Sequence, residues 1–126
     1  MKRLALILAI FLPATPAMAE TFGAIAYSFK TNKFGRSWEY GSRGQAEAAA
    51  KQYCAEAGGR QCATAVWVED SCAAVARAQS TRTIKNMGAA WGYDNEAAAG
   101  NRAIQECQAR NAGQQCWVVA SVCSYR

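Results

Sequence analysis

The sequence contains no histidine. Ser-His-Asp triads, Cys-His nucleophile pairs and histidine-ligated zinc sites are therefore excluded. Paired carboxylates remain available for hydrolysis of a glycan bond. Asp94 and Glu96, however, suit a helix N-terminus and Asp70 suits a turn. We expect a protein that is not an enzyme, with a glycan hydrolase as the less favoured alternative. The acidic residues predicted near strand ends or turns are Glu39, Glu69, Asp70, Asp94 and Glu96.

The sequence also lacks an apolar run long enough to cross a membrane as a helix, which needs about 20 residues. The run Leu4 to Leu12 is shorter, follows two basic residues and precedes the small-residue motif Ala17-Met18-Ala19. This pattern predicts a secretory signal peptide, residues 1–19, with cleavage after Ala19. We expect residues 20–126 to form a single domain that is secreted or periplasmic and does not span the membrane.

A strong imbalance of charge is absent as well. The chain holds 14 Lys or Arg and nine Asp or Glu, and two of the basic residues lie in the predicted signal peptide, so the remainder carries a net charge of +3. Without a binding motif or a dense basic stripe, we expect no nucleic-acid partner. Lys30, Lys33 and Arg36 cluster in one predicted loop, which is either solvated or a contact for an anionic partner.

Two copies of one unit follow each other along the chain. Each copy has a Trp-x-Tyr strand, an Ala-rich helix ending in Cys, and an apolar strand that begins with Cys. Sixteen residues separate the Trp from the helical Cys in both copies. A duplicated unit usually buries its face against its own copy. The first copy contains Trp38, Tyr40, Cys54 and Cys62, and the second contains Trp91, Tyr93, Cys107 and Cys116.

The six cysteines include no Cys-x-x-Cys pair, so neither a redox motif nor a zinc ribbon is expected, and we predict no metal and no cofactor. An even number of cysteines in a short exported chain predicts disulfides. The repeat pairs the Cys that closes each helix with the Cys that opens the next strand. The predicted disulfides are Cys54–Cys62, Cys107–Cys116 and, from the two cysteines that remain, Cys72–Cys123.

The local patterns predict the order ββαβ in each copy, with a boundary near Asp70. Ser42 with Gln45 resembles a capping box, and Asp94 or Asn95 caps the second helix. We expect an α+β fold: two tandem ββαβ repeats, about 22–69 and 71–125, forming one small mixed or antiparallel sheet covered by two helices. The expected strands are 22–29, 36–40, 62–69, 72–78, 88–93 and 115–122.

Two packing details follow from these patterns. The strands 62–69 and 72–78 are joined by so short a turn that we expect them to pair as an antiparallel hairpin. The Ala-rich helix faces favour close packing on the sheet, with Trp67, Trp117 and valines filling the layer between.

The Trp-x-Tyr strands give the best indication of a binding surface. Trp38 with Tyr40, and Trp91 with Tyr93, stand at i and i+2, which places both rings of a pair on one strand face. Exposed, they would form a platform for sugar rings or apolar side chains, with Arg36 nearby for cation-assisted contacts. We favour the simpler interpretation that these aromatics belong to the core, because few other large side chains can fill it.

Several of these motifs together resemble a known family. GAIAYS after the predicted cleavage site, the helix motif EAAAxxxC, the VWV strand and the ending CWVVASVC are similar to domain-of-unknown-function family 4189. The resemblance covers nearly all of residues 20–126 and implies a small secreted bacterial domain with no agreed activity, so the family supplies no catalytic residues to carry over to this chain. The copies depart from each other where Tyr53 becomes Glu106 and Lys51 becomes Ile104, so the helices need not bury identical faces.

We expect an exported, disulfide-stabilised interaction module that binds a protein partner, of an inhibitor, immunity or host-interaction type. A rigid scaffold lowers the ordering cost of such binding. The alternative is a domain that binds glycan or the cell envelope through its Trp-x-Tyr strands. The candidate binding residues are Trp38, Tyr40, Trp91, Tyr93, Lys30, Lys33 and Arg36.

Overall fold

The computed structural model describes residues 20–125, so the predicted signal peptide lies outside the described residues. Each copy supplies two strands, a helix and a third strand, which confirms the duplicated ββαβ order. Within this range no helix is long and apolar enough to cross a membrane. The elements are β1 (Phe22–Ser28), β2 (Lys33–Tyr40), α1 (Arg43–Glu56), β3 (Ala63–Glu69), β4 (Ser71–Ala78), the 3-10 turn η1 (Ile84–Asn86), β5 (Gly88–Tyr93), α2 (Glu96–Arg110) and β6 (Cys116–Ser124).

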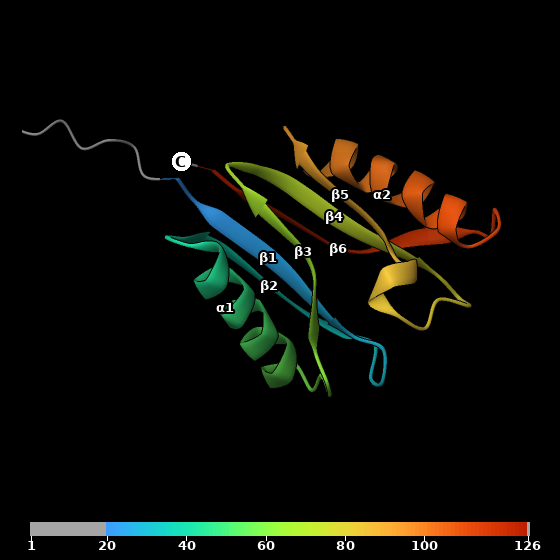
Figure 1. The fold of residues 1–126 in the computed structure, drawn as a ribbon, viewed down its shortest axis with the longest axis horizontal. Coiled ribbons are helices and arrows are strands. Elements are labelled where there is room, and N and C mark those ends of the chain that lie inside the picture. The colour runs from blue at the N-terminus through green and yellow to red at the C-terminus, as the bar shows by residue number, and fades with distance from the viewer. Residues whose placement is uncertain (1–19, 126) are drawn as a thin grey trace, which may run out of the picture.

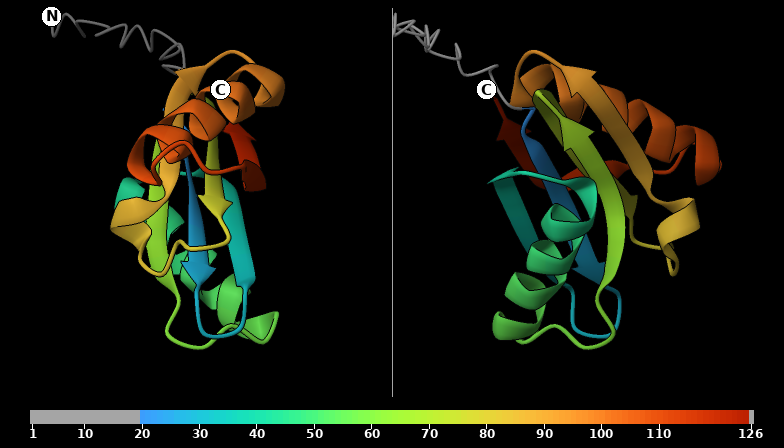
Figure 2. Two further views of the ribbon diagram at one scale, coloured as in Figure 1. Left: turned by 90° about the vertical axis from the view of Figure 1, so that its right-hand side faces the viewer. Right: turned by 60° about the vertical axis from the view of Figure 1, so that its left-hand side comes forward.

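The six strands form two antiparallel sheets stacked between the two helices (Figure 1). The strand order is β2-β1-β3 in the first sheet and β5-β4-β6 in the second. Figure 2 shows α1 outside the first sheet and α2 outside the second, so the layers run helix, sheet, sheet, helix. The predicted α+β class is confirmed. The expectation of one sheet is wrong, because each copy completes a three-stranded sheet of its own.

The predicted hairpin between β3 and β4 is also wrong. β3 pairs with β1, whereas β4 pairs with β5 and β6. Asp70 joins the two strands in a left-handed conformation, φ 50°. Its backbone N–H donates to the Thr21 carbonyl at 3.0 Å, and its Oδ1 accepts from the Thr21 N–H at 2.9 Å. The short link therefore carries the chain from one sheet to the other. β3 cannot pair with β4, because β5 and β6 already occupy both edges of β4.

The two copies match down to their strand irregularities. In β1 the register shifts around Gly23 and after Ile25, and in β4 it shifts around Ala73 and after Val75. In the first copy Phe22 lies opposite Glu69, and at the equivalent position of the second copy Cys72 lies opposite Cys123. The structure contains the disulfides Cys54–Cys62, Cys107–Cys116 and Cys72–Cys123, which is the pairing expected from the repeat.

Each helix approaches the second strand of its copy so closely that only glycine fits there. A Cβ on Gly35 would lie 2.1 Å from the Ala50 carbonyl oxygen, and one on Gly88 would lie 2.0 Å from that of Ala103. The close packing predicted for the Ala-rich faces is therefore confirmed. The helices bury equivalent positions: Ala46, Ala50 and Cys54 in α1, and Ala99, Ala103 and Cys107 in α2.

The tryptophans do not fill this layer as expected. Trp67 lies at its rim, where it packs partly buried beside the α1 cluster under the Arg43 guanidinium, 4.5 Å from the ring centroid. Trp117 pairs with Arg77 and is 46% exposed. Larger apolar side chains gather instead between the two sheets. This inter-sheet core contains Ile25, Tyr27, Val66, Val68, Ala73, Val75, Met87, Ala120 and Val122.

We predict that Gly35→Ala destabilises the fold by about 3 kcal/mol or more, because the new methyl group overlaps the α1 backbone and the helix must move off its sheet. Gly44→Ala is the control, since nothing lies within 4 Å of its Cβ position in α1 and alanine favours a helix by about 1 kcal/mol over glycine. Denaturant unfolding with the disulfides intact measures both. An unchanged Gly35→Ala midpoint would disprove the close approach.

Candidate functional site

The Trp-x-Tyr segments each contain a β-bulge, so the predicted pairing of Trp and Tyr on one face is wrong. Glu39 in β2 has a left-handed backbone, φ 63°, where the register with β1 shifts. The extra residue turns Tyr40 toward α1, while Trp38 lies beside Val122 and Cys123 of β6. The same irregularity occurs in β5 at Gly92, φ 83°. Each bulge thus sends the two rings to opposite faces of the strand.

The prediction that these aromatics form the core is wrong for both tryptophans. Trp38 is 51% exposed and Trp91 is 64% exposed. The helix-facing layer is too thin for them because alanine and glycine line it. Tyr40 and Tyr93 are half-buried beside the helices. A hydrogen bond with the Tyr53 hydroxyl raises the pKa of the Tyr40 hydroxyl above its ordinary value.

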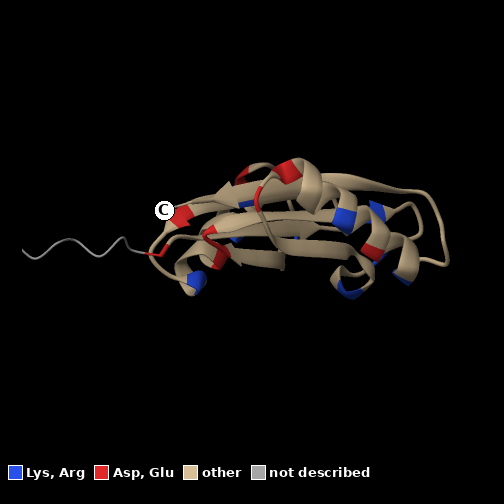
Figure 3. Ribbon diagram, turned by 90° about the horizontal axis from the view of Figure 1, so that it is seen from above, with Lys and Arg blue, Asp and Glu red and all other residues tan. Residues whose placement is uncertain are grey.

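The three candidate basic residues do not share a loop. β2 begins at Lys33, which pairs with Ser28, so Lys30 alone of the three lies in the turn. Arg36 belongs to the strand and donates through NH1 to the Ser121 carbonyl of β6 at 3.1 Å, which ties the edges of the two sheets together. The predicted basic loop is therefore wrong. Basic and acidic positions are interspersed along the ribbon (Figure 3).

A cleft of about 670 Å³ opens between the sheets where β2 and β6 lie side by side. Six aromatic or aliphatic residues and five polar or charged residues line it, and its two charged residues, Arg77 and Arg82, are both basic. Arg77 is 8% exposed. The lining residues are Tyr27, Phe29, Asn32, Phe34, Arg77, Gln79, Thr81, Arg82, Trp117, Val118 and Val119.

Neutral groups satisfy the Arg77 guanidinium. Its Nε donates to the Ala78 carbonyl at 3.1 Å, and NH2 donates to the Thr81 carbonyl at 2.8 Å and the Gln79 carbonyl at 3.4 Å. NH1 donates to the Tyr27 hydroxyl at 3.0 Å and to Asn32 Oδ1 at 2.8 Å. The rings of Tyr27, Phe29 and Trp117 lie 5.1–5.9 Å from its central carbon. In the described part of the chain, the two salt bridges involve other arginines, on the helices.

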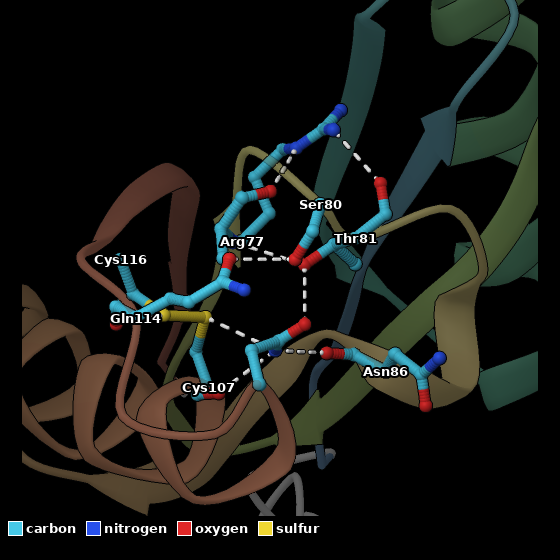
Figure 4. The surroundings of a disulfide bond; sticks show 9 residues. Arg77, Ser80, Thr81, Asn86, Cys107, Gln114 and Cys116 are labelled. Carbon is cyan, nitrogen blue, oxygen red and sulfur yellow. Dashed lines mark hydrogen bonds between the residues drawn. A yellow bond between two sulfur atoms is a disulfide. The ribbon is translucent and has the colours of Figure 1, made fainter.

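A hydrogen-bonded chain connects this arginine to the Cys107–Cys116 disulfide (Figure 4). The Thr81 hydroxyl accepts from the Ala78 N–H and donates to Asn111 Oδ1, both at 3.0 Å. Asn111 Nδ2 donates to the Cys107 carbonyl and to the Asn86 carbonyl, each at 2.8 Å. The turn that follows β4, and with it one wall of the cleft, is therefore fixed to the C-terminal end of α2.

At the equivalent place on the opposite side of the sandwich, the residue that corresponds to Phe34 is buried rather than exposed. Met87 precedes Gly88 as Phe34 precedes Gly35, but Met87 is 2% exposed and Phe34 is 40% exposed. The connection between β4 and β5 is longer than that between β1 and β2, and its Ile84 packs against the inter-sheet core. Met87 therefore packs in the inter-sheet core with Ile84 against it, whereas Phe34 lines the cleft beside β2 and β6.

A second depression, of about 600 Å³, follows the outer edge of β2. All seven residues from Phe34 to Tyr40 line it, together with Tyr53 of α1. β2 stands at the edge of its sheet and pairs with β1 alone among the described strands. Phe34 belongs to both depressions, so the edge groove runs into the cleft.

The acidic residues considered for hydrolysis are spread over three places. Glu39 lies in β2, Glu69 and Asp70 lie at the junction of β3 and β4, and Asp94 and Glu96 lie at the start of α2. None of them lines the 670 Å³ cleft. Residues 20–125 contain no group of three or more His, Cys, Asp or Glu that could hold a metal.

The sequence patterns did not identify Arg77 as a site residue. Its signal was the single charged residue in the otherwise apolar segment Cys72–Ala78. A charged side chain in a central strand is rarely fully buried unless it is paired, so this position could have indicated a functional arginine.

Comparison with known proteins gives one match. A family model described as Domain of unknown function (DUF4189) matches residues 22–123. No curated protein and no solved structure matches the chain.

We predict that Thr81→Val lowers the free energy of unfolding by about 2 kcal/mol, because Asn111 Oδ1 and the Ala78 N–H lose their partner in a buried place. Amide hydrogen exchange of residues 79–82 should accelerate. Thr83→Val is the matched control, since Thr83 is exposed and caps η1 without a side-chain hydrogen bond. Equal protection in both variants would show that the hydroxyl does not hold the turn.

Proposed function

Since this chain belongs to the DUF4189 family, whose description names no activity, we propose its function from the geometry: an exported, non-catalytic module that binds a protein partner along the edge of β2. The partner contributes a short extended segment. Inhibitor, immunity and host-interaction roles all fall within this class.

The observation that carries the proposal is the groove along β2. An edge strand presents main-chain donors and acceptors, and an added strand pairs with them while its side chains enter pockets on alternate faces. Phe34 and Trp38 stand exposed on the inter-sheet side of β2, and Tyr53 stands exposed on the helix side. Lys33 and the bulge at Glu39 limit pairing to the few residues between them. A short extended segment can pair along this stretch, whereas the stretch is too short for continued edge-to-edge pairing of many copies.

The scaffold supports this role because it holds the edge rigid. The Ser37 hydroxyl donates to the Ala46 carbonyl of α1 at 2.6 Å, and Arg36 joins β2 to β6. The Cys54–Cys62 disulfide fixes the end of α1 to the region before β3. A preformed edge lowers the ordering cost of binding. Three disulfides also suit an oxidising compartment, in agreement with the predicted signal peptide.

The non-catalytic part of the proposal rests on chemistry. The chain has no histidine, and all six cysteines are in disulfides. The cleft is lined by no carboxylate that could act as a general acid or base.

The exposed Trp91 ring supports a second candidate, binding of a glycan of the cell envelope. An exposed indole stacks well on a sugar ring, and this one lines a pocket of about 420 Å³ between β3 and β5.

The duplication supplies a matched pair of variants, Trp38→Ala and Trp91→Ala, which remove exposed rings from equivalent positions. We predict that Trp38→Ala weakens the complex at least about 30-fold, since a central aromatic side chain contributes about 2 kcal/mol or more, while Trp91→Ala changes the affinity less than about twofold. The oxidised protein captures partners from envelope and culture-medium fractions, and calorimetry with the purified partner then measures both variants.

Both variants should keep the wild-type thermal melt, because the two rings are more than half exposed. Equal effects of the two substitutions on the protein complex would exclude the β2 edge. Capture of glycan alone, lost in Trp91→Ala, would replace the protein partner with the second candidate.

A further inference from the structure

We propose that the cleft containing Arg77 binds an organic carboxylate attached to a flat apolar group. The site adjoins the β2 edge but does not depend on it, because its lining comes mainly from β1, β4, β6 and the turns after β1 and β4. The inference therefore goes beyond the proposed protein partner.

The charges that line the cleft favour an anionic ligand. Arg77 keeps its positive charge under all ordinary conditions and is 8% exposed. Every acceptor that it contacts is an uncharged hydroxyl, amide or carbonyl oxygen. The cleft lining adds a second cation, Arg82, and no acid. Two cations beside a partly desolvated cavity attract an anion more strongly than they would in open solvent.

The free hydrogen-bond donors of the cleft belong to Arg82 and Asn32 rather than to Arg77. All five N–H groups of Arg77 are accounted for within the protein, so it acts on a ligand through its charge. Arg82 donates from NH1 to the carbonyls of Gln79 and Thr81, and within residues 20–125 its Nε and NH2 have no hydrogen-bond partner. Asn32 accepts at Oδ1 from both Tyr27 and Arg77. Its two Nδ2 N–H groups have no hydrogen-bond partner within residues 20–125, so they are available to a ligand.

This donor supply selects the kind of anion. One guanidinium edge and one amide match the two oxygens of a singly charged carboxylate. A phosphate group would bring up to two charges and a third oxygen, more than the free donors of Arg82 and Asn32 match. The carboxylate is therefore the better fit.

The aromatic side chains in the walls of the cleft favour a flat apolar group on the ligand. Phe29, Phe34 and Trp117 line the cleft, and the last two are 40% and 46% exposed. A volume of about 670 Å³ lies within the roughly 300–1,000 Å³ typical of small-molecule sites. A flat apolar group on the ligand would cover these rings while its carboxylate faces Arg82. A carboxylate without such a group would leave the aromatic side chains of the cleft exposed to water.

The second copy differs from the first at the positions equivalent to Phe34 and Tyr27, so the cleft is not a simple consequence of the duplicated fold. In the second copy Met87 fills the position of Phe34, and the first copy has Tyr27 where the second has Arg77. The second copy thus supplies the cation, and the exposed ring of Phe34 comes from the first.

The test compares three probes that differ in the presence and position of a carboxylate: N-acetylphenylalanine, its neutral amide, and N-acetyl-aspartyl-phenylalaninamide. The processed protein with its three disulfides is titrated with each, and Trp117 indole and Arg82 side-chain NMR signals report the site. We expect one or both acids to bind at least about tenfold more tightly than the amide, since the amide carries no negative charge to pair with Arg82. Binding of the first acid alone identifies a chain-terminal carboxylate, and binding of the second alone identifies an acidic side chain.

Arg82→Gln should lower the affinity for the acids about tenfold and leave that for the amide unchanged. Arg102→Gln is the matched control, because Arg102 pairs with Glu106 on α2, outside the cleft. Arg77 itself is left unaltered, since it holds the turn after β4. Equal affinity for acid and amide, no binding of any probe, or signal changes confined to other surfaces would each overturn the proposal. The probes need no protein partner, so this result is independent of the Trp38 experiment.

Discussion

The close approach of each helix to the second strand of its copy is the constraint on which the rest of the structure depends. At Gly35 and Gly88 the helix backbone occupies the space where a Cβ would stand. Alanine must therefore line the facing helix positions, and the layer becomes too thin for large side chains. The disulfide at the end of each helix then fixes a separation that small residues alone would hold only through weak contacts.

A thin outer layer determines where the aromatic residues go. Valine, isoleucine, methionine and one tyrosine fill the space between the sheets, and the tryptophans are left at the rims. This is why the rings most typical of a core in a small Ala-rich domain, Trp38 and Trp91, are exposed. The surface features suited to binding thus follow from how the helices pack.

The sequence was sufficient for the features that depend on local chemistry or on the repeat. Ser42 and Asn95 accept hydrogen bonds from the helix N-termini, and the repeat alone indicated which cysteines pair. The sequence was insufficient for the features that depend on backbone geometry or on long-range strand pairing. Glu39 in a left-handed conformation is unusual for a residue with a side chain, and the bulge there reverses the direction of Tyr40. The separation into two sheets depends on long-range pairing that the short link at Asp70 does not reveal.

The link at Asp70 has a further consequence for the order of the chain. Thr21, at the start of the first copy, contacts Asp70, where that copy ends, and its hydroxyl accepts from Ser124 at the end of the second copy, at 2.9 Å. Figure 1 shows the start of β1 beside the end of β6. The start and the end of the two-copy unit therefore lie side by side. The chain passes from one copy to the other at Asp70, and at the equivalent joint between Ser124 and Thr21 the backbone is not continuous. A circularly permuted chain that begins at Ser71 and ends at Asp70 would trace the same fold, so neither copy is intrinsically the first.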